Sequence, residues 1–116
     1  MGKYFKEEEF ACPCCGKIFL SPFLIPTLDK IRKDYGKPMV VTSGFRCPSH
    51  NQAVGGASAS EHLIGAAADI ECITSGDRFA LVVACLKHGI RRIGIGKTFI
   101  HIGIALSSPQ SKIWLY

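Results

Sequence analysis

Residues 58–71 of the chain read SASEHLIGAAADIE. Asp69 stands there in an almost wholly apolar run, a few positions after the single histidine of the stretch, His62. An ionised carboxylate is costly to bury unless a cation or strong hydrogen-bond donors compensate it. Asp69 is therefore either a structural residue, capping a turn or pairing with an arginine, or a metal ligand with His62 as the second ligand.

Length and composition indicate one globular domain. The chain has 116 residues, of which 47% are hydrophobic and 20% charged, an ordinary balance for a single folded core. No apolar run is long enough to span a bilayer, and the N-terminus lacks the apolar segment of a signal peptide. We expect a monomeric domain over residues 1–116, synthesised in the cytoplasm and without a membrane span.

The chain is basic, with a formal net charge of +5 and a pI near 9.0. Such a charge favours anionic surroundings. The basic residues are not accompanied by a recognisable nucleic-acid-binding motif. Nucleic acid is therefore not an expected partner, and an anionic cell-wall polymer suits the charge equally well.

The hydrophobic pattern predicts a mixed α+β fold. Ser21 and Ser75 are expected helix N-caps, and Phe79 and Leu86, with Val82 and Val83, are expected to share one apolar helix face. Helices are expected over 22–35, 48–54 and 76–88, and strands over 38–42, 67–72, 92–96, 99–104 and 112–115. Most strands come late and follow short connections, which is typical of an α+β domain with a mainly antiparallel sheet packed against helices.

A second histidine lies on one of these strands. In the stretch Thr98–Ile104 the residues alternate with period two, so Ile100 and Ile102 face the core while His101 and Gly103 share the other face. Two histidines and one carboxylate, with a coordination position left open, make a catalytic type of zinc site. The cation would also compensate the charge of Asp69.

These residues resemble a known family. Ser60-x-His62-x-x-Gly65-x-Ala67-x-Asp69 is similar to the S-x-H-x-x-G-x-A-x-D signature of the peptidase M15 family, which contains zinc D-Ala-D-Ala carboxypeptidases and related peptidoglycan endopeptidases. Further segments resemble the compact, phage-associated branch of this family: Glu9-Phe10-Ala11-Cys12, Ser43-Gly44-Phe45-Arg46, Asn51 to Gly56, Phe99-Ile100-His101 and Trp114-x-Tyr116. The resemblance covers almost the whole chain and implies the zinc DD-carboxypeptidase (hedgehog/DD-peptidase-like) fold.

The resemblance also implies roles for individual residues. His62, Asp69 and His101 would hold Zn²⁺, and water would attack a peptidoglycan stem peptide at either a D-Ala-D-Ala or an L-Ala-D-Glu bond. Arg46 would act in catalysis by polarising the scissile carbonyl or gripping a peptide carboxylate. Ser60 would bind substrate. Without the motif, Arg46 is equally a salt-bridge residue and Ser60 equally a turn cap.

The chain departs from that branch at Gly103, where the pattern H-x-D places an acid two residues after the last histidine. A positioned general base typically contributes 10²–10⁴-fold, so its loss predicts a catalytically weak, zinc-bound module for cell-wall binding or phage structure as the alternative function. Glu61 and Glu71 are the nearest acids in sequence. If only the base is missing, Gly103→Asp is expected to raise activity.

The absence of a signal peptide leads to an expectation about location. Peptidoglycan lies outside the cytoplasmic membrane, so we expect the protein to reach the wall by phage-type release through a membrane lesion, or as part of a particle.

The cysteines form two groups. Cys72 and Cys85 stand among apolar residues and are expected in the core. Residues 12–16 read CPCCG, a cysteine-rich knuckle, and Cys47-Pro48-Ser49-His50 adds a C-x-x-H pair. We expect free thiols or one disulfide here in preference to a structural zinc, because we interpret the knuckle as lacking the C-x-x-C spacing that is familiar from zinc sites. A cysteine-knuckle nucleic-acid binder is a third possibility that rests only on this pattern and the basic charge.

Overall fold

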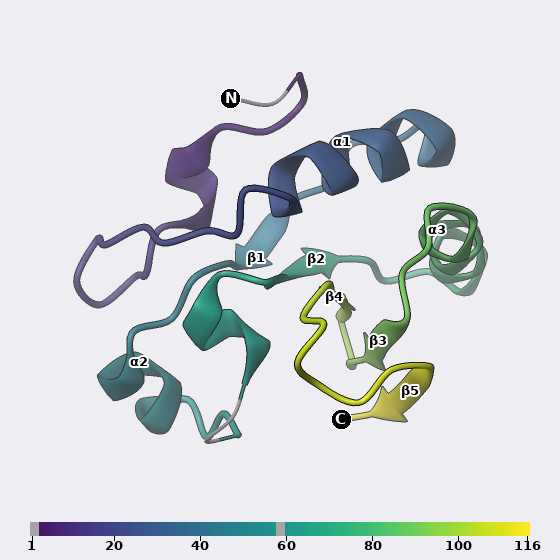
Figure 1. Ribbon diagram of the computed structural model, residues 1–116. Helices are drawn as coiled ribbons and strands as arrows, with labels where there is room; N and C mark the ends of the chain where they lie inside the picture. The colour runs from purple at the N-terminus through teal and green to yellow at the C-terminus, as the bar shows by residue number, and fades with distance from the viewer. Residues whose placement is uncertain (1–2, 58–59) are drawn as a thin grey trace.

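The structure, a computed structural model, describes residues 3–57 and 60–116, so Met1 and Gly2 of the expected domain and Ser58 and Ala59 of the central stretch lie outside the described residues. A five-stranded sheet of order β1-β2-β4-β3-β5 runs through the middle of the fold (Figure 1). Its strands are β1 (Val41–Ser43), β2 (Ala67–Glu71), β3 (Arg92–Ile95), β4 (Phe99–Gly103) and β5 (Lys112–Leu115). The β1–β2, β2–β4 and β4–β3 pairs are antiparallel and the β3–β5 pair is parallel. The expected α+β class with a mainly antiparallel sheet is confirmed.

The helices divide between the two faces of this sheet. They are α1 (Leu24–Tyr35), α2 (Pro48–Ala53) and α3 (Ser75–Lys87), with the short 3-10 helices η1 (Glu7–Phe10) and η2 (Glu61–Ile64). Helices α1 and α3 pack against each other over the core, whereas α2 and η2 lie together below the opposite end of β2 in Figure 1. Among the described residues, no helix is both long and apolar enough to cross a membrane.

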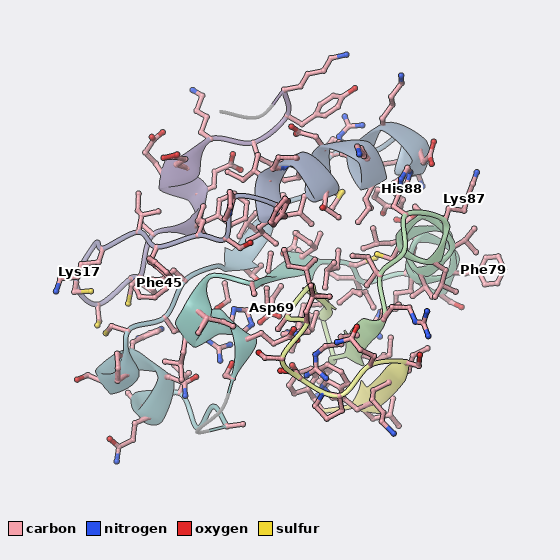
Figure 2. The ribbon with its side chains drawn as sticks, viewed as in Figure 1. Lys17, Phe45, Asp69, Phe79, Lys87 and His88 are labelled. Carbon is pink, nitrogen blue, oxygen red and sulfur yellow. The ribbon has the colours of Figure 1, made fainter. Side chains whose placement is uncertain are left out.

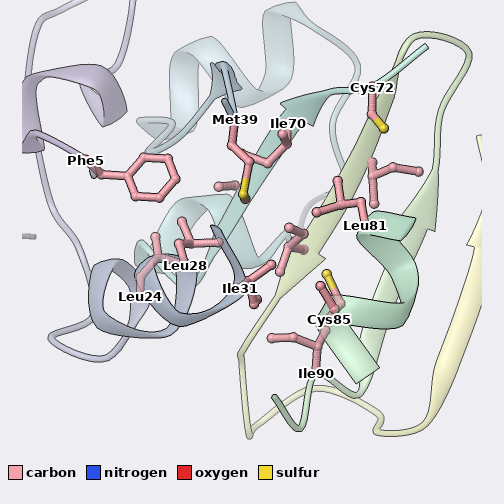
Figure 3. Close-up of a cluster of buried hydrophobic side chains, with 14 of the residues drawn as sticks. Phe5, Leu24, Leu28, Ile31, Met39, Ile70, Cys72, Leu81, Cys85 and Ile90 are labelled. Carbon is pink, nitrogen blue, oxygen red and sulfur yellow. The ribbon is translucent and has the colours of Figure 1, made fainter. Parts of the chain in front are cut away.

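The core fills the space between α1, α3 and one face of the sheet (Figure 3). Leu24, Leu28 and Ile31 of α1 are fully buried at helical spacing, and Ile70 of β2 belongs to the same buried cluster. The thiols of Cys72 and Cys85 belong to the same cluster, as predicted. Because side chains alternate along a strand, Asp69 next to Ile70 in β2 and His101 between Ile100 and Ile102 in β4 face the other side.

The predicted apolar face of α3 is wrong for three of its four residues, since Val82 alone of the four packs, partly buried, against the core. Phe79 is 74% exposed and projects away from the body of the protein (Figure 2), and Leu86 is 55% exposed. The buried face instead consists of Leu81, Ala84 and Cys85. Ala84 and Cys85, at i+3 and i+4 from Leu81, are small and leave room for neighbouring elements. Close packing therefore places these small residues in the core instead of the larger hydrophobic side chains.

Two helix starts also differ from the sequence prediction. Helix α1 begins at Leu24 rather than Pro22, because Ser21 and Pro22 belong to a turn closed by the Leu24 N–H on the Ser21 carbonyl (3.1 Å). Thr74, not Ser75, is the N-cap of α3, where its hydroxyl accepts a hydrogen bond from the backbone N–H of Asp77 (3.2 Å). The C-terminus of α1 is as expected, with Gly36 in a left-handed conformation (φ 77°) that residues with side chains rarely adopt.

Candidate metal centre and active site

Strand pairing places Asp69 directly opposite His101. The two are register partners in the antiparallel β2–β4 ladder, and both lie on the face that turns away from the isoleucine core. Helix η2 covers this face and contributes His62. All three side chains are buried, with exposed fractions of 1% for His62, 4% for Asp69 and 3% for His101.

The donor atoms of these three residues converge. Asp69 Oδ1 lies 3.2 Å from His62 Nε2 and 3.0 Å from His101 Nδ1. The three donors lie within 4.8 Å of one another. Nitrogen and oxygen ligands about 2.0–2.1 Å from a tetrahedral zinc are about 3.3 Å apart, so the chemistry and spacing of this donor set fit Zn²⁺ with a coordination position to spare.

The outer nitrogen of each imidazole is fixed by the protein. His62 Nδ1 donates to the carbonyl oxygen of Gly44 (2.7 Å), which leaves the lone pair of Nε2 facing Asp69. His101 Nε2 lies 2.6 Å from a carboxylate oxygen of Glu61, which leaves Nδ1 facing Asp69. Such partners on the far nitrogen select the tautomer and ring orientation that a metal ligand needs.

The residues of the Ser60–Asp69 signature each have a local structural role. The Ser60 hydroxyl caps η2 by accepting from the His62 backbone N–H (3.3 Å). Gly65 ends η2 in the left-handed region (φ 66°), and a Cβ there would lie 2.0 Å from the Phe19 carbonyl oxygen. Ala67, fully buried, begins β2. With this spacing the chain turns from η2 into β2, and the side chains of His62 and Asp69 lie next to each other.

Arg46 faces the same point from the loop after β1. Its Nη2 lies 3.4 Å from Asp69 Oδ2. Its Nη1 donates to Asn51 Oδ1 (3.2 Å) and its Nε to Ser43 Oγ (3.2 Å). The guanidinium is therefore held on three sides and its side chain is only 15% exposed.

A cavity of about 260 Å³ opens over the three converging side chains. Arg46, Ser60 and His101 line it. Trp114 of β5 and the following Tyr116 form an aromatic wall, with the Trp114 ring 5.2 Å from the imidazole of His101 between centroids. The structure brings all five residues predicted from sequence, namely Arg46, Ser60, His62, Asp69 and His101, to this cavity or its floor.

The site is strongly polarised. Burial alone would raise the pKa of Asp69, but the contacts of its carboxylate with the imidazoles of His101 and His62 lower it to about 2. Burial lowers the pKa of His101, yet Asp69 and Glu61 together raise it above its usual value. Two carboxylates flanking the same imidazole thus favour positive charge at the centre, the condition that a divalent cation also satisfies.

The family of the chain follows from comparison with known proteins. The family model described as Peptidase M15 matches residues 3–104. The chain belongs to the peptidase M15 family. No curated protein matches it. Members of the M15 family are generally zinc-dependent peptidases, and the converging His62, Asp69 and His101 of this M15 chain are a donor set suited to that metal.

One residue at the M15 site, Glu61, was named from the sequence only as a nearby acid, without an assigned role. Glu61 is 3% exposed, and its carboxylate contacts His101 at 2.6 Å, the Ala105 backbone N–H at 3.1 Å and the Nε of Arg92 at 3.0 Å. The contact with Arg92 is an ion pair without the alignment of a hydrogen bond. Its position inside the signature, next to His62, was the available signal.

Glu61 also fills the place of the acid that is missing at position 103. A Cβ on Gly103 would lie 2.0 Å from Glu61 Oε2 and 2.4 Å from Oε1. The carboxylate therefore comes from η2 instead of β4, and Gly103 is the residue that leaves room for it. The other sequence candidate, Glu71, is exposed and does not line the cavity.

This packing favours a different outcome for Gly103→Asp than the expected gain of activity. Three partners hold the Glu61 carboxylate, so it cannot move aside for a new side chain without losing these contacts. The single substitution would force a second buried carboxylate against the first and would not restore a missing group.

Proposed function

We propose that the protein is a zinc-dependent peptidase that cleaves peptidoglycan stem peptides with water as the nucleophile. The observation that carries this proposal is the convergence of His62 Nε2, Asp69 Oδ1 and His101 Nδ1 at the floor of a cavity that Arg46 lines. Zinc held by such a set supplies Lewis acidity, which lowers the pKa of water and polarises a carbonyl oxygen.

Arg46 is the proposed catalytic residue supplied by the chain. Its guanidinium is anchored through Ser43 and Asn51, so it is preorganised at the cavity and needs little rearrangement when substrate binds. A fixed guanidinium stabilises the negative charge that develops on the carbonyl oxygen during attack, or binds a carboxylate of the peptide in a two-point contact.

Glu61 is the proposed positioning residue. Both of its oxygens are occupied, and contacts with His101 and Arg92 lower its pKa despite burial, which acts in the opposite direction. A general base works best with a pKa near the working pH and an oxygen within reach of the proton. Glu61 meets neither condition, and its role is to keep a proton on Nε2 of His101 so that Nδ1 faces inward.

The walls of the cavity support a peptide that carries negative charge. Arg46 and Arg92 line the cavity, and the Arg92 guanidinium lies 5.0 Å from the centre of the Trp114 ring. Stem peptides present free carboxylates, for which arginine is a suitable partner. Ser60 is placed to contact a substrate terminus, although its hydroxyl already caps η2.

The test is hydrolysis of purified peptidoglycan fragments, with products identified by mass spectrometry. Zinc-loaded protein should release D-alanine or cleave an L-Ala-D-Glu bond, a chelator should stop the reaction, and zinc should restore it. His62→Ala serves as the matched inactive control. No product from zinc-loaded protein, while a known M15 peptidase digests the same fragments, would refute the peptidase proposal.

A catalytically weak wall-binding or phage structural module is the second candidate. It is favoured by one observation: apart from the proposed ligand Asp69, Glu61 is the single acidic side chain among the described residues at the cavity, and both of its oxygens are already in contact with protein groups. This alternative predicts that zinc-loaded protein sediments with purified cell walls without releasing product. Turnover of the fragments would exclude it.

A further inference from the structure

A second cluster of metal-binding side chains lies away from the cavity. The loop between η1 and α1 carries Cys12, Cys14 and Cys15, and Cys47 is the N-cap of α2. Figure 2 shows sulfur atoms gathered between the loop that carries Lys17 and the start of α2. Folding therefore brings together thiols that are 35 positions apart in the chain.

The sulfur atoms are spaced as ligands and not as bonded pairs. Cys12 Sγ lies 3.6 Å from Cys14 Sγ and 3.7 Å from Cys47 Sγ, and Cys14 Sγ lies 3.2 Å from Cys47 Sγ. With Cys15 included, all four sulfurs lie within 4.8 Å of one another. A disulfide requires about 2.05 Å, whereas four thiolates about 2.3 Å from a tetrahedral zinc are about 3.8 Å apart.

The loop has the backbone of a ligand-bearing knuckle. The Gly16 N–H donates to the Cys12 carbonyl (2.7 Å) and the Cys12 N–H to the Lys17 carbonyl (2.8 Å), with Gly16 in a left-handed conformation (φ 73°). The Cys47 N–H points at Cys12 Sγ (3.5 Å), a donor that favours a thiolate. Cys12 and Cys15 are separated by two residues, so the sequence does contain a C-x-x-C pair, contrary to our interpretation of the knuckle.

We propose that Cys12, Cys14, Cys15 and Cys47 hold a structural Zn²⁺ separate from the M15 centre. All six cysteines are free in this structure, which agrees with the first of the two expected alternatives, free thiols, and not with the second, one disulfide. Four protein ligands leave no open coordination position, so this site is closed and not catalytic. It fastens the N-terminal loop to the residue that follows Arg46.

Cobalt substitution distinguishes this site from the His-Asp-His centre. Thiolate ligands give Co²⁺ a sulfur-to-metal charge-transfer band, which nitrogen and oxygen ligands cannot give. The wild-type protein, refolded or exchanged with Co²⁺ under reducing conditions, should show the band, and zinc should displace it. The band should persist in His62→Ala, so the result does not depend on the peptidase proposal.

Variants then identify the ligands. Cys14→Ser and Cys15→Ser change exposed side chains, so they should leave the core intact. Each should weaken zinc binding by more than about 100-fold, which is more than the loss of a residue that only hydrogen-bonds to a ligand would cost. His50→Ala, which removes the histidine of the C-x-x-H pair, should leave the band unchanged. Cys85→Ala is the control for a buried thiol outside the cluster.

Three results would overturn the proposal. The first is a wild-type protein without the charge-transfer band, and the second is a disulfide within the cluster in protein purified without oxygen. The third is a band that survives Cys14→Ser and disappears in His50→Ala. That result would make His50 a ligand in place of Cys14.

Discussion

The carboxylate of Glu61 in η2 occupies the space that an acid at position 103 of β4 would need, and this leads to a quantitative prediction. Glu61→Ala leaves Arg92 and the Ala105 N–H without their buried partner, and breaking a buried pair in this way costs about 3–5 kcal/mol. Gly103→Asp retains Glu61 and adds a second carboxylate, and two unit charges about 4 Å apart repel by about 4 kcal/mol at an effective dielectric constant of about 20.

The double variant Glu61→Ala, Gly103→Asp removes the overlap, because the new side chain enters the space that the Glu61 carboxylate vacates. Its destabilisation should be smaller than the sum of the two single effects by about 3 kcal/mol, the upper end of coupling between residues in contact. The four proteins form a double-mutant cycle, measured by urea unfolding in zinc-saturated buffer.

Gly103→Ala is the control for this cycle, since it adds only the Cβ and no charge. It should still couple to Glu61, because the overlap begins at that atom. Effects that add within about 0.5 kcal/mol would refute the reasoning, and so would a Gly103→Asp protein as stable as the wild type. Either outcome would mean that residue 61 and residue 103 do not share one space.

Three further predictions concern the metal ligands, pH and the core. His62→Ala, Asp69→Ala and His101→Ala should each lower zinc content by about one equivalent in elemental analysis, and a zinc content equal to that of the wild type in all three variants would place no metal at this centre. In chelated protein, the pKa of Asp69, lowered from 3.8 to about 2, stabilises the fold above pH 4 by about 2 kcal/mol; this stability should disappear as pH falls through 2, and acid unfolding of Asp69→Asn should lack that dependence. Leu81→Ala should cost about 2–5 kcal/mol and Phe79→Ser less than about 0.5 kcal/mol in denaturant unfolding, and the reverse order would restore the face predicted from sequence.

The convergence of His62, Asp69 and His101 could be predicted from sequence because each residue carries a signal in its own segment. The period-two alternation around His101 shows that it faces away from Ile100 and Ile102, and the burial cost of Asp69 requires a compensating group. A strand pair in register then suffices to bring His101 and Asp69 together. The M15 resemblance supplied Arg46 and Ser60, whose positions depend on loops that periodicity does not describe.

The role of Glu61 could not be predicted in this way. Its carboxylate reaches His101 only because η2 lies across β4, and the vacancy that admits it is the missing side chain of Gly103. The proposed zinc knuckle depends similarly on contact between Cys12 and Cys47, which no local pattern specifies. The face of α3 was wrong because hydrophobicity alone ranks Phe79 above Ala84, whereas close packing favours the smaller residue.

The short segment Ser43–Cys47 touches both proposed zinc sites. The Gly44 carbonyl accepts from His62, the Arg46 side chain reaches Asp69, and the Cys47 sulfur lies in the knuckle. Zinc that orders this segment at one site would lower the entropic cost of ordering it at the other, so the two binding equilibria would be cooperative. Because such coupling is reciprocal, zinc in the knuckle would raise the affinity of the M15 centre by the same factor as the M15 zinc raises that of the knuckle.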